Sequence, residues 1–238
     1  MISRRRLLGY GAGLPLLGVD SLQAEKADLA VSNESMQRNS RIISGYASES
    51  IHRTATEGDR RTGRWLLEML NELGVRSTLN EFPFERLDTI ESQLEIGSMR
   101  IEGEPLYDCL SDSAWRQGRL GPLGSDAEIG VAMMPPGAGG DHYRHLTTVR
   151  RMATHRAIVV VTDDRLPAGG IAMINAEAYR TPFGPPVLQI ANDRWESVRE
   201  AVQQGSDARV IVNCERVSTT AANVQGKVEG SMCAWPRR

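Results

Sequence analysis

The residues of this chain that could do chemistry are few and scattered. Its four histidines are His52, His142, His145 and His155. Two of them stand three positions apart with Asp141 beside them, so their rings would share one side of a helix. Two imidazoles on a polar helical face are a weak metal motif, because a zinc site needs at least three protein ligands. A solvated helix face is therefore the simpler interpretation.

The other polar candidates are equally weak. Asp163 and Asp164 follow the apolar run 157–162 and could form an acidic corner, but a turn at the end of a strand explains them more simply. A zinc-independent hydrolase that used either aspartate has no supporting motif. For His52, a hydrogen-bonded place in a turn is favoured over catalysis. The sequence contains no G-x-S-x-G, S-x-x-K or phosphate-binding G-x-x-x-x-G-K pattern.

The chain has three cysteines, Cys109, Cys214 and Cys233, and none forms a C-x-x-C pair. Redox and zinc-ribbon motifs are thereby excluded. One disulfide could form in an oxidising compartment and leave one thiol over. Three free or buried thiols are the simpler expectation.

Length and charge place the chain among ordinary globular proteins. Its 238 residues allow one or two domains, and 40% of them are hydrophobic. The formal net charge is −2, and the arginines are spread along the whole chain. This balance gives no support to a nucleic-acid partner.

The amino terminus has the three parts of an export signal. Positive charge is concentrated at residues 3–6, an apolar stretch follows at 7–19, and small residues precede a cut near Ala24. The apolar stretch is shorter than the about 20 residues that span a bilayer. The pair Arg4-Arg5 followed by x-Leu-Leu is typical of a twin-arginine signal. We therefore expect residues 1–24 to be removed from a periplasmic or secreted protein without a stable membrane anchor; a disordered basic tail is the alternative.

The mature chain begins with helical patterns. Residues 25–40 have no apolar period, which predicts an irregular segment, and 41–51 predict a short helix. A stronger helix follows, since Trp65, Leu66, Met69, Leu70 and Leu73 form one apolar stripe. Thr56 and Asp59 have the spacing of a capping box at its start, and Gly74 ends it.

Short strands dominate the rest. The sequence predicts a strand at 75–84 and a hairpin of 90–96 with 99–101, turning at Gly97-Ser98. Helices are predicted at 141–154 and 195–204. Further strands are predicted at 129–133, 157–162, 171–174, 187–190, 208–214 and 223–228, the last without a neighbour. This order of elements indicates a mixed α/β fold.

Two segments of the mature chain resemble a known family. Residues 52–66, His-Arg-Thr-Ala-Thr-Glu-Gly-Asp-Arg-Arg-Thr-Gly-Arg-Trp-Leu, resemble the opening of the di-zinc aminopeptidases (clan MH), in which an Arg-x-small-x-Glu-Gly turn leads into a helix. Residues 220–231, with Asn223-Val224-x-Gly226, resemble the second strand of that family's sheet. Some members carry a protease-associated (PA) domain between these two strands, and 88–217 fit such an insert.

The resemblance implies four parts. These are the signal at 1–24, the lead-in helices and first peptidase-like strand at 25–87, the PA-like insert at 88–217, and the second peptidase-like strand with a divergent tail at 218–238. The implied fold is an incomplete edge of the peptidase sheet, one helix and two strands, that carries a β-rich insert with two helices.

Members of that family hydrolyse peptide bonds with two zinc ions, whose ligands lie beyond this region in His-x-Asp, Asp-Asn and Glu-Glu patterns. None of these patterns occurs in the chain. We therefore expect no catalytic, cofactor-binding or metal-binding residue here, and zinc only in intact relatives. The expected function is that of an exported aminopeptidase-like homologue, truncated and inactive as this chain. The alternative is a standalone periplasmic PA-like module that binds peptides or proteins.

Overall fold

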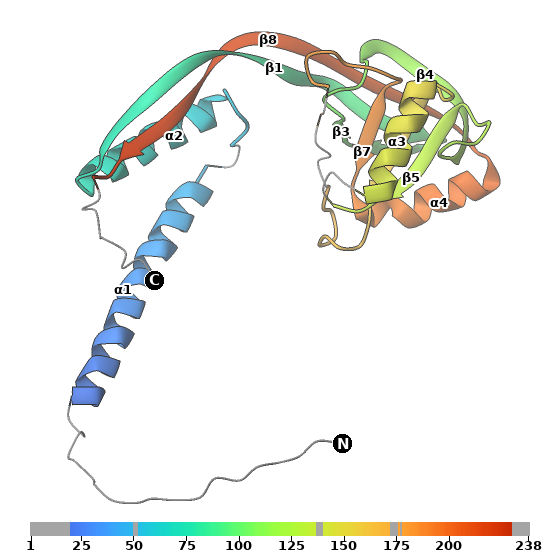
Figure 1. Ribbon diagram of the computed structural model, residues 1–238. Helices are drawn as coiled ribbons and strands as arrows, with labels where there is room; N and C mark the ends of the chain where they lie inside the picture. Colours follow the sequence, from blue (N-terminus) through green and yellow to red (C-terminus); the bar gives the residue numbers. More distant parts are fainter. Residues whose placement is uncertain (1–19, 50–51, 137–139, 172–175, 177, 230–238) are drawn as a thin grey trace, which may run out of the picture. The chain divides into compact units, whose positions relative to one another are not determined.

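The computed structural model describes residues 20–49, 52–136, 140–171, 176 and 178–229, with side chains from residue 33 onward (Figure 1). The chain divides into two compact units. The first comprises Met1–Glu81 and Ala222–Arg238, and the second comprises Phe82–Ala221. The described residues form four α-helices and eight strands, which confirms the mixed α/β class.

The first helix, α1, extends over Asp20–Ala47. The prediction that 25–40 would be irregular is therefore wrong, and the helix expected at 41–51 is only its end. No proline and only one glycine occur between its bounds, and four alanines with two each of glutamate, glutamine and arginine outweigh its five serines, so helix propensity prevails without an apolar stripe.

Helix α2, Glu57–Glu72, confirms the predicted helix and its cap. The Thr56 hydroxyl accepts a hydrogen bond from the Asp59 amide at 3.3 Å, and the Asp59 carboxylate accepts one from the Ala55 amide at 2.7 Å. The first bond satisfies an amide of the first turn, and the second satisfies the amide just before the N-cap residue, Thr56, so the arrangement is a near variant of the capping box. The predicted apolar stripe is only half-buried, and Leu73 at its end is 59% exposed.

Two long strands, β1 (Arg76–Ile96) and β8 (Asp207–Lys227), each continue from one unit into the other. The sequence predicted each as two separate strands and left 223–228 without a neighbour, which is wrong, because β1 and β8 are adjacent in the sheet. Valine and threonines at 217–220 favour extended backbone and keep β8 continuous despite its polar composition.

The sheet order is β2-β1-β8-β4-β5-β6-β7-β3. The remaining strands are β2 (Met99–Glu102), β3 (Glu104–Pro105), β4 (Asp112–Pro122), β5 (Ile129–Met134), β6 (Ala157–Thr162) and β7 (Val187–Ile190). Strand β2 pairs with β1 through the predicted two-residue turn, where Gly97 has a φ of 57°. Strands β4 to β7 are parallel neighbours, whereas β4 and β8 are antiparallel.

Helices α3 (Gly140–Met152) and α4 (Trp195–Gln204) belong to the second unit and confirm the two helices predicted there. A short 3-10 helix, Asn192–Arg194, precedes α4, and Gly205 ends it in the left-handed conformation. Strand β4 was not predicted, because glycines and charged residues interrupt any period-2 pattern in it. The strand predicted at 171–174 lies almost wholly outside the described residues.

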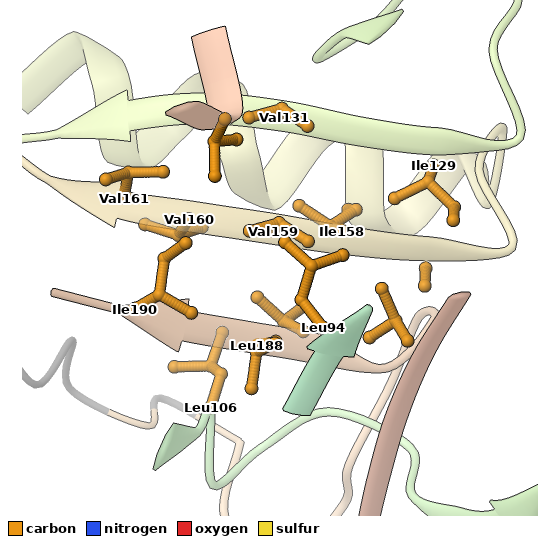
Figure 2. Close-up of a cluster of buried hydrophobic side chains, with 14 of the residues drawn as sticks. Leu94, Leu106, Ile129, Val131, Ile158, Val159, Val160, Val161, Leu188 and Ile190 are labelled. Atoms are coloured by element: carbon orange, nitrogen blue, oxygen red, sulfur yellow. The ribbon is translucent and has the colours of Figure 1, made fainter. Parts of the chain in front are cut away.

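The core of the second unit is centred on β6, whose six residues are all buried. A parallel strand covered on both faces has this uniform apolar character. Figure 2 shows its valines with Leu188 and Ile190 of β7 and with Leu94 of β1. Helix α3 adds Tyr143, Leu146 and Val149 to this core, and α4 adds Val198 and Ala201.

Candidate functional site

The two histidines of the H-x-x-H pattern lie on α3, and both are exposed. Asp141 forms an ion pair with Arg144 on the same helix. The His145 ring lies beside Gly124, because a Cβ there would be 3.6 Å from it. No third ligand joins the pair among the described residues, where no group of three or more histidine, cysteine or acidic side chains could hold a metal ion. The donors described in this chain therefore do not fit a zinc centre.

His155 has a different environment, since only 4% of it is exposed. Its Nδ1 lies 2.7 Å from the Ala127 carbonyl oxygen, and the Gly124 amide donates to its Nε2 at 2.9 Å. These contacts assign the proton to Nδ1, because Nε2 is the acceptor. Both nitrogens are thus used to hold the 124–127 turn.

His52 stacks on Tyr46, with ring centroids 3.8 Å apart and an angle of 6° between the planes. Its Nδ1 lies 3.4 Å from the Thr62 hydroxyl. Both contacts join residues of the first unit around the start of α2. This geometry is that of a turn residue.

The acidic pair at the end of β6 is a turn as well. Asp163 accepts from the Arg165 amide at 3.1 Å and from its Nε at 2.8 Å. The Asp163 amide donates to the carbonyl oxygen of Met134, the last residue of β5, at 2.9 Å, so this turn is hydrogen-bonded to β5. Asp164 is exposed. The two carboxylates therefore do not form a catalytic pair.

The described cysteines, Cys109 and Cys214, are free of disulfides, and Cys233 lies outside the described residues, as do Arg4 and Arg5. Burial raises the pKa of the Cys109 thiol to about 12. A thiol with such a pKa stays protonated at neutral pH and is a poor nucleophile. Its Sγ faces the Val187 carbonyl oxygen at 3.9 Å.

A cavity of about 620 Å³ lies in the second unit. Apolar groups of Leu110, Phe183 and Pro186 form part of its wall, with Asp112 as its single acidic residue. Four basic side chains line it as well: Arg116, Arg150, Arg151 and Arg156. We call this set the arginine cavity.

A fully buried ion pair supports the arginine cavity. Arg150 and Asp108 are both 0% exposed, and the Arg150 Nη2 donates to an Asp108 carboxylate oxygen at 2.8 Å. The same nitrogen donates to the Asp108 carbonyl oxygen at 2.8 Å and to that of Phe183 at 3.1 Å. Asp108 also accepts from the amides of Ala178 and Phe183, at 3.2 and 3.0 Å. The pair thereby joins α3 to two loops that are distant in sequence.

Glycine is required where the loop meets α3. Gly184 has a φ of 73°, and a Cβ on it would lie 2.8 Å from the Arg150 carbonyl oxygen. The left-handed backbone and this close approach both exclude larger residues. Phe183 is thereby held with its ring centroid 4.0 Å from the Arg150 guanidinium carbon and 4.8 Å from that of Arg151.

Sequence reasoning missed the arginine cavity. Arg150 and Arg151 are identical neighbours in the sequence, yet one is buried and the other exposed. The local signal is Pro185-Pro186 before a buried strand. Two prolines indicate a loop of fixed conformation, but they do not indicate which residues contact it. Asp108 lies 42 residues from Arg150.

No protein-family model and no curated protein matches the chain. Solved structures do. A zinc aminopeptidase from Bacillus subtilis superimposes with a TM-score of 0.58 at 14% identity, over 80% of this chain and 47% of that one. The peptidase M28 precursor of Shewanella amazonensis SB2B gives 0.59 at 16% identity, over 89% of this chain and 55% of its own.

The chain shares the fold of these peptidases. It spans about half the length of the structures that it matches, and at such identities the likeness extends to fold alone. None of the described helices is long and apolar enough to cross a membrane.

Proposed function

We propose that this chain is the substrate-handling part of an exported, zinc-aminopeptidase-type protein and does not itself carry the zinc centre. The observation that supports this most is the shared fold, which covers 80–89% of this chain but only about half of each peptidase. In this proposal residues 88–217 are a PA-like insert, and the segments on either side belong to the peptidase domain.

The absence of hydrolysis by residues 1–238 is part of the proposal. Two-metal peptidases need histidine and carboxylate ligands that activate a water and stabilise the oxyanion. The His-x-Asp, Asp-Asn and Glu-Glu patterns that would supply them are missing from the sequence. Alone, the chain is expected to bind but not to cleave.

The test is an assay of the purified chain on aminoacyl p-nitroanilides, with and without added zinc. We expect release of p-nitroaniline at the rate of the buffer alone, while a zinc aminopeptidase serves as the positive control. Release that follows the amount of chain and stops with a chelator would refute the proposal.

A standalone binding module is the second candidate, and the core of the second unit favours it. Nearly all buried apolar residues of the described chain belong to Phe82–Ala221, so this unit has the core that independent folding requires. Residues 82–221 expressed alone should unfold in one cooperative transition in urea. A non-cooperative profile would count against the module.

Export is proposed through Arg4 and Arg5. Residues 1–30 fused to a folded reporter should direct it to the periplasm of a bacterium with a working twin-arginine pathway. Replacement of both arginines by lysine keeps the charge and should abolish export, because the signal is read by a receptor. Unchanged export of the lysine variant would exclude this route.

A further inference from the structure

The charges of the arginine cavity do not balance. Arg116 pairs with Asp112, and Arg150 pairs with Asp108. Arg151 and Arg156 form no ion pair within 4.0 Å among the described residues. Arg156 acts on the Glu128 carboxylate only from a longer distance, where its charge adds to the larger effect of the Arg119 amide hydrogen bond in lowering the pKa of Glu128. The cavity therefore carries an excess of at least about one positive charge beside an apolar wall.

Guanidinium nitrogens of the cavity also lack partners. Nε and Nη1 of the fully buried Arg150 make no hydrogen bond within the described chain, and neither does the buried Nε of Arg116. Buried polar groups in native proteins nearly always have a partner, so three such nitrogens around one cavity call for an acceptor, which is either a water molecule or an atom of a ligand. Among the described residues, the guanidinium of Arg156 makes one long hydrogen bond, 3.5 Å from Nη1 to the Gln117 carbonyl oxygen.

The walls restrict what that acceptor can be. The cavity volume of about 620 Å³ lies within the range of small-molecule and peptide sites, about 300–1,000 Å³. Planar guanidinium groups match the two oxygens of a carboxylate. Leu110, 53% exposed at the rim, and the Phe183 ring offer apolar contact to a neighbouring side chain.

We propose that the arginine cavity binds a carboxylate of a peptide, with an apolar residue of that peptide against Leu110 and Phe183. The exposed guanidinium groups of Arg151 and Arg156 make the first contacts. Arg150 adds a fixed charge behind them and holds the Phe183 ring. The carboxylate is either a chain terminus or an acidic side chain, since both present the same two oxygens. This inference goes beyond the proposed function and does not depend on hydrolysis.

The experiment is calorimetric titration of the full chain with three N-acetylated tripeptides. The first is Leu-Ala-Leu with a free carboxyl terminus, the second is its neutral amide, and the third is Leu-Asp-Leu amide. We expect the neutral amide to bind at least about tenfold more weakly than one or both of the others. The two acidic peptides distinguish a terminal from a side-chain carboxylate. Added salt should weaken the binding, because exposed charges are screened.

The matched variants are the double variant R151Q/R156Q and the control R144Q. Arg144 lies on the same helix as Arg151 and is exposed, but it is not part of the cavity. The double variant should lose binding about tenfold or more while R144Q keeps it, and circular dichroism should show that the parent and both variants are folded. Equal binding of the neutral amide, no binding of any peptide, displacement by phosphate alone, or an unaffected double variant would each overturn the proposal.

Discussion

The two units differ in how they bury apolar surface. In the second unit, β6 is covered on both faces, and residues from seven strands and two helices share one core. In the first unit, Ala55 is the single buried hydrophobic residue among the side chains described, while Ile43 and Tyr46 of α1 are 67% and 48% exposed. Burial of apolar area supplies most of the favourable free energy of folding. We therefore expect the second unit to contribute most of the free energy of unfolding of this chain.

The first unit nonetheless has well-formed local interactions, a helix cap and an ion pair. Helix α2 is capped at its start, and Arg61 holds Glu49 through two hydrogen bonds of 2.7 and 2.8 Å. Such interactions shape a unit but contribute little free energy when exposed. The apolar stripe of α2 is suited to cover a further surface, which agrees with the proposal that this unit is part of a larger sheet.

The largest effect is expected from the buried ion pair. Asp108→Asn leaves the charge of the fully buried Arg150 side chain without compensation, and should lower the free energy of unfolding by about 3–5 kcal/mol. Urea denaturation, monitored by circular dichroism, measures this change in the free energy of unfolding. The control Asp126→Asn removes a carboxylate that is 92% exposed and should cost less than about 1 kcal/mol. Equal effects would mean that Arg150 is not buried in solution.

Truncation of an apolar side chain should sharpen the contrast between the units. Leu188→Ala in β7 removes a side chain that is 0% exposed, and should cost about 2–5 kcal/mol through lost burial and a residual cavity. Ile43→Ala on α1 should cost less than about 0.5 kcal/mol. Urea midpoints of the two variants decide this. A large loss for Ile43→Ala would show that α1 is packed more tightly than the described structure has it.

Strand β8 offers a test within one element. Amides of 210–212 lie in the second unit, whereas those of 222–227 lie in the first. We expect the first group to exchange with solvent at least about a hundredfold more slowly, because local opening is easier where little apolar surface is buried. Native-state hydrogen exchange measures both groups in one sample. Uniform protection along β8 would mean that the first unit is stable by itself, contrary to the proposal that it is part of a larger sheet.

The same contrast explains what the sequence could predict. Dense β-branched runs such as 157–162 and the stripe of α4 belong to the buried unit, and there the predicted elements are confirmed. Errors concern segments without an apolar pattern. Helix α1 follows propensity alone, β4 is a strand whose side chains are mostly exposed, and the middle of β8 mixes exposed with half-buried side chains. Pattern reasoning detects burial, so it fails where structure forms without it.

The candidate site could not be predicted for a related reason. Motif searches look for residues at fixed spacing, but the arginine cavity is assembled by β4, α3 and the loop before β7. Its central contact joins Asp108 to Arg150, and only the tertiary fold distinguishes Arg150 from Arg151. The predicted metal and acidic candidates, in contrast, are a helix surface and a strand-end turn.

The smallest effect, and the last test, concerns a carboxylate in the second unit that joins two strands. Glu95 of β1 forms ion pairs with Arg209 of β8 and Arg100 of β2, and hydrogen bonding to Arg209 is the main cause that lowers the pKa of Glu95. A carboxyl group whose pKa is lower in the folded state adds stability at pH values above its unfolded pKa, about 4.3. That stability is lost as the pH falls through the folded pKa. Glu95→Gln should therefore be less stable than the parent at pH 7, and the two urea midpoints should converge in acid. A difference that persists unchanged to low pH would show that Glu95 acts through packing and hydrogen bonding, and not through its charge.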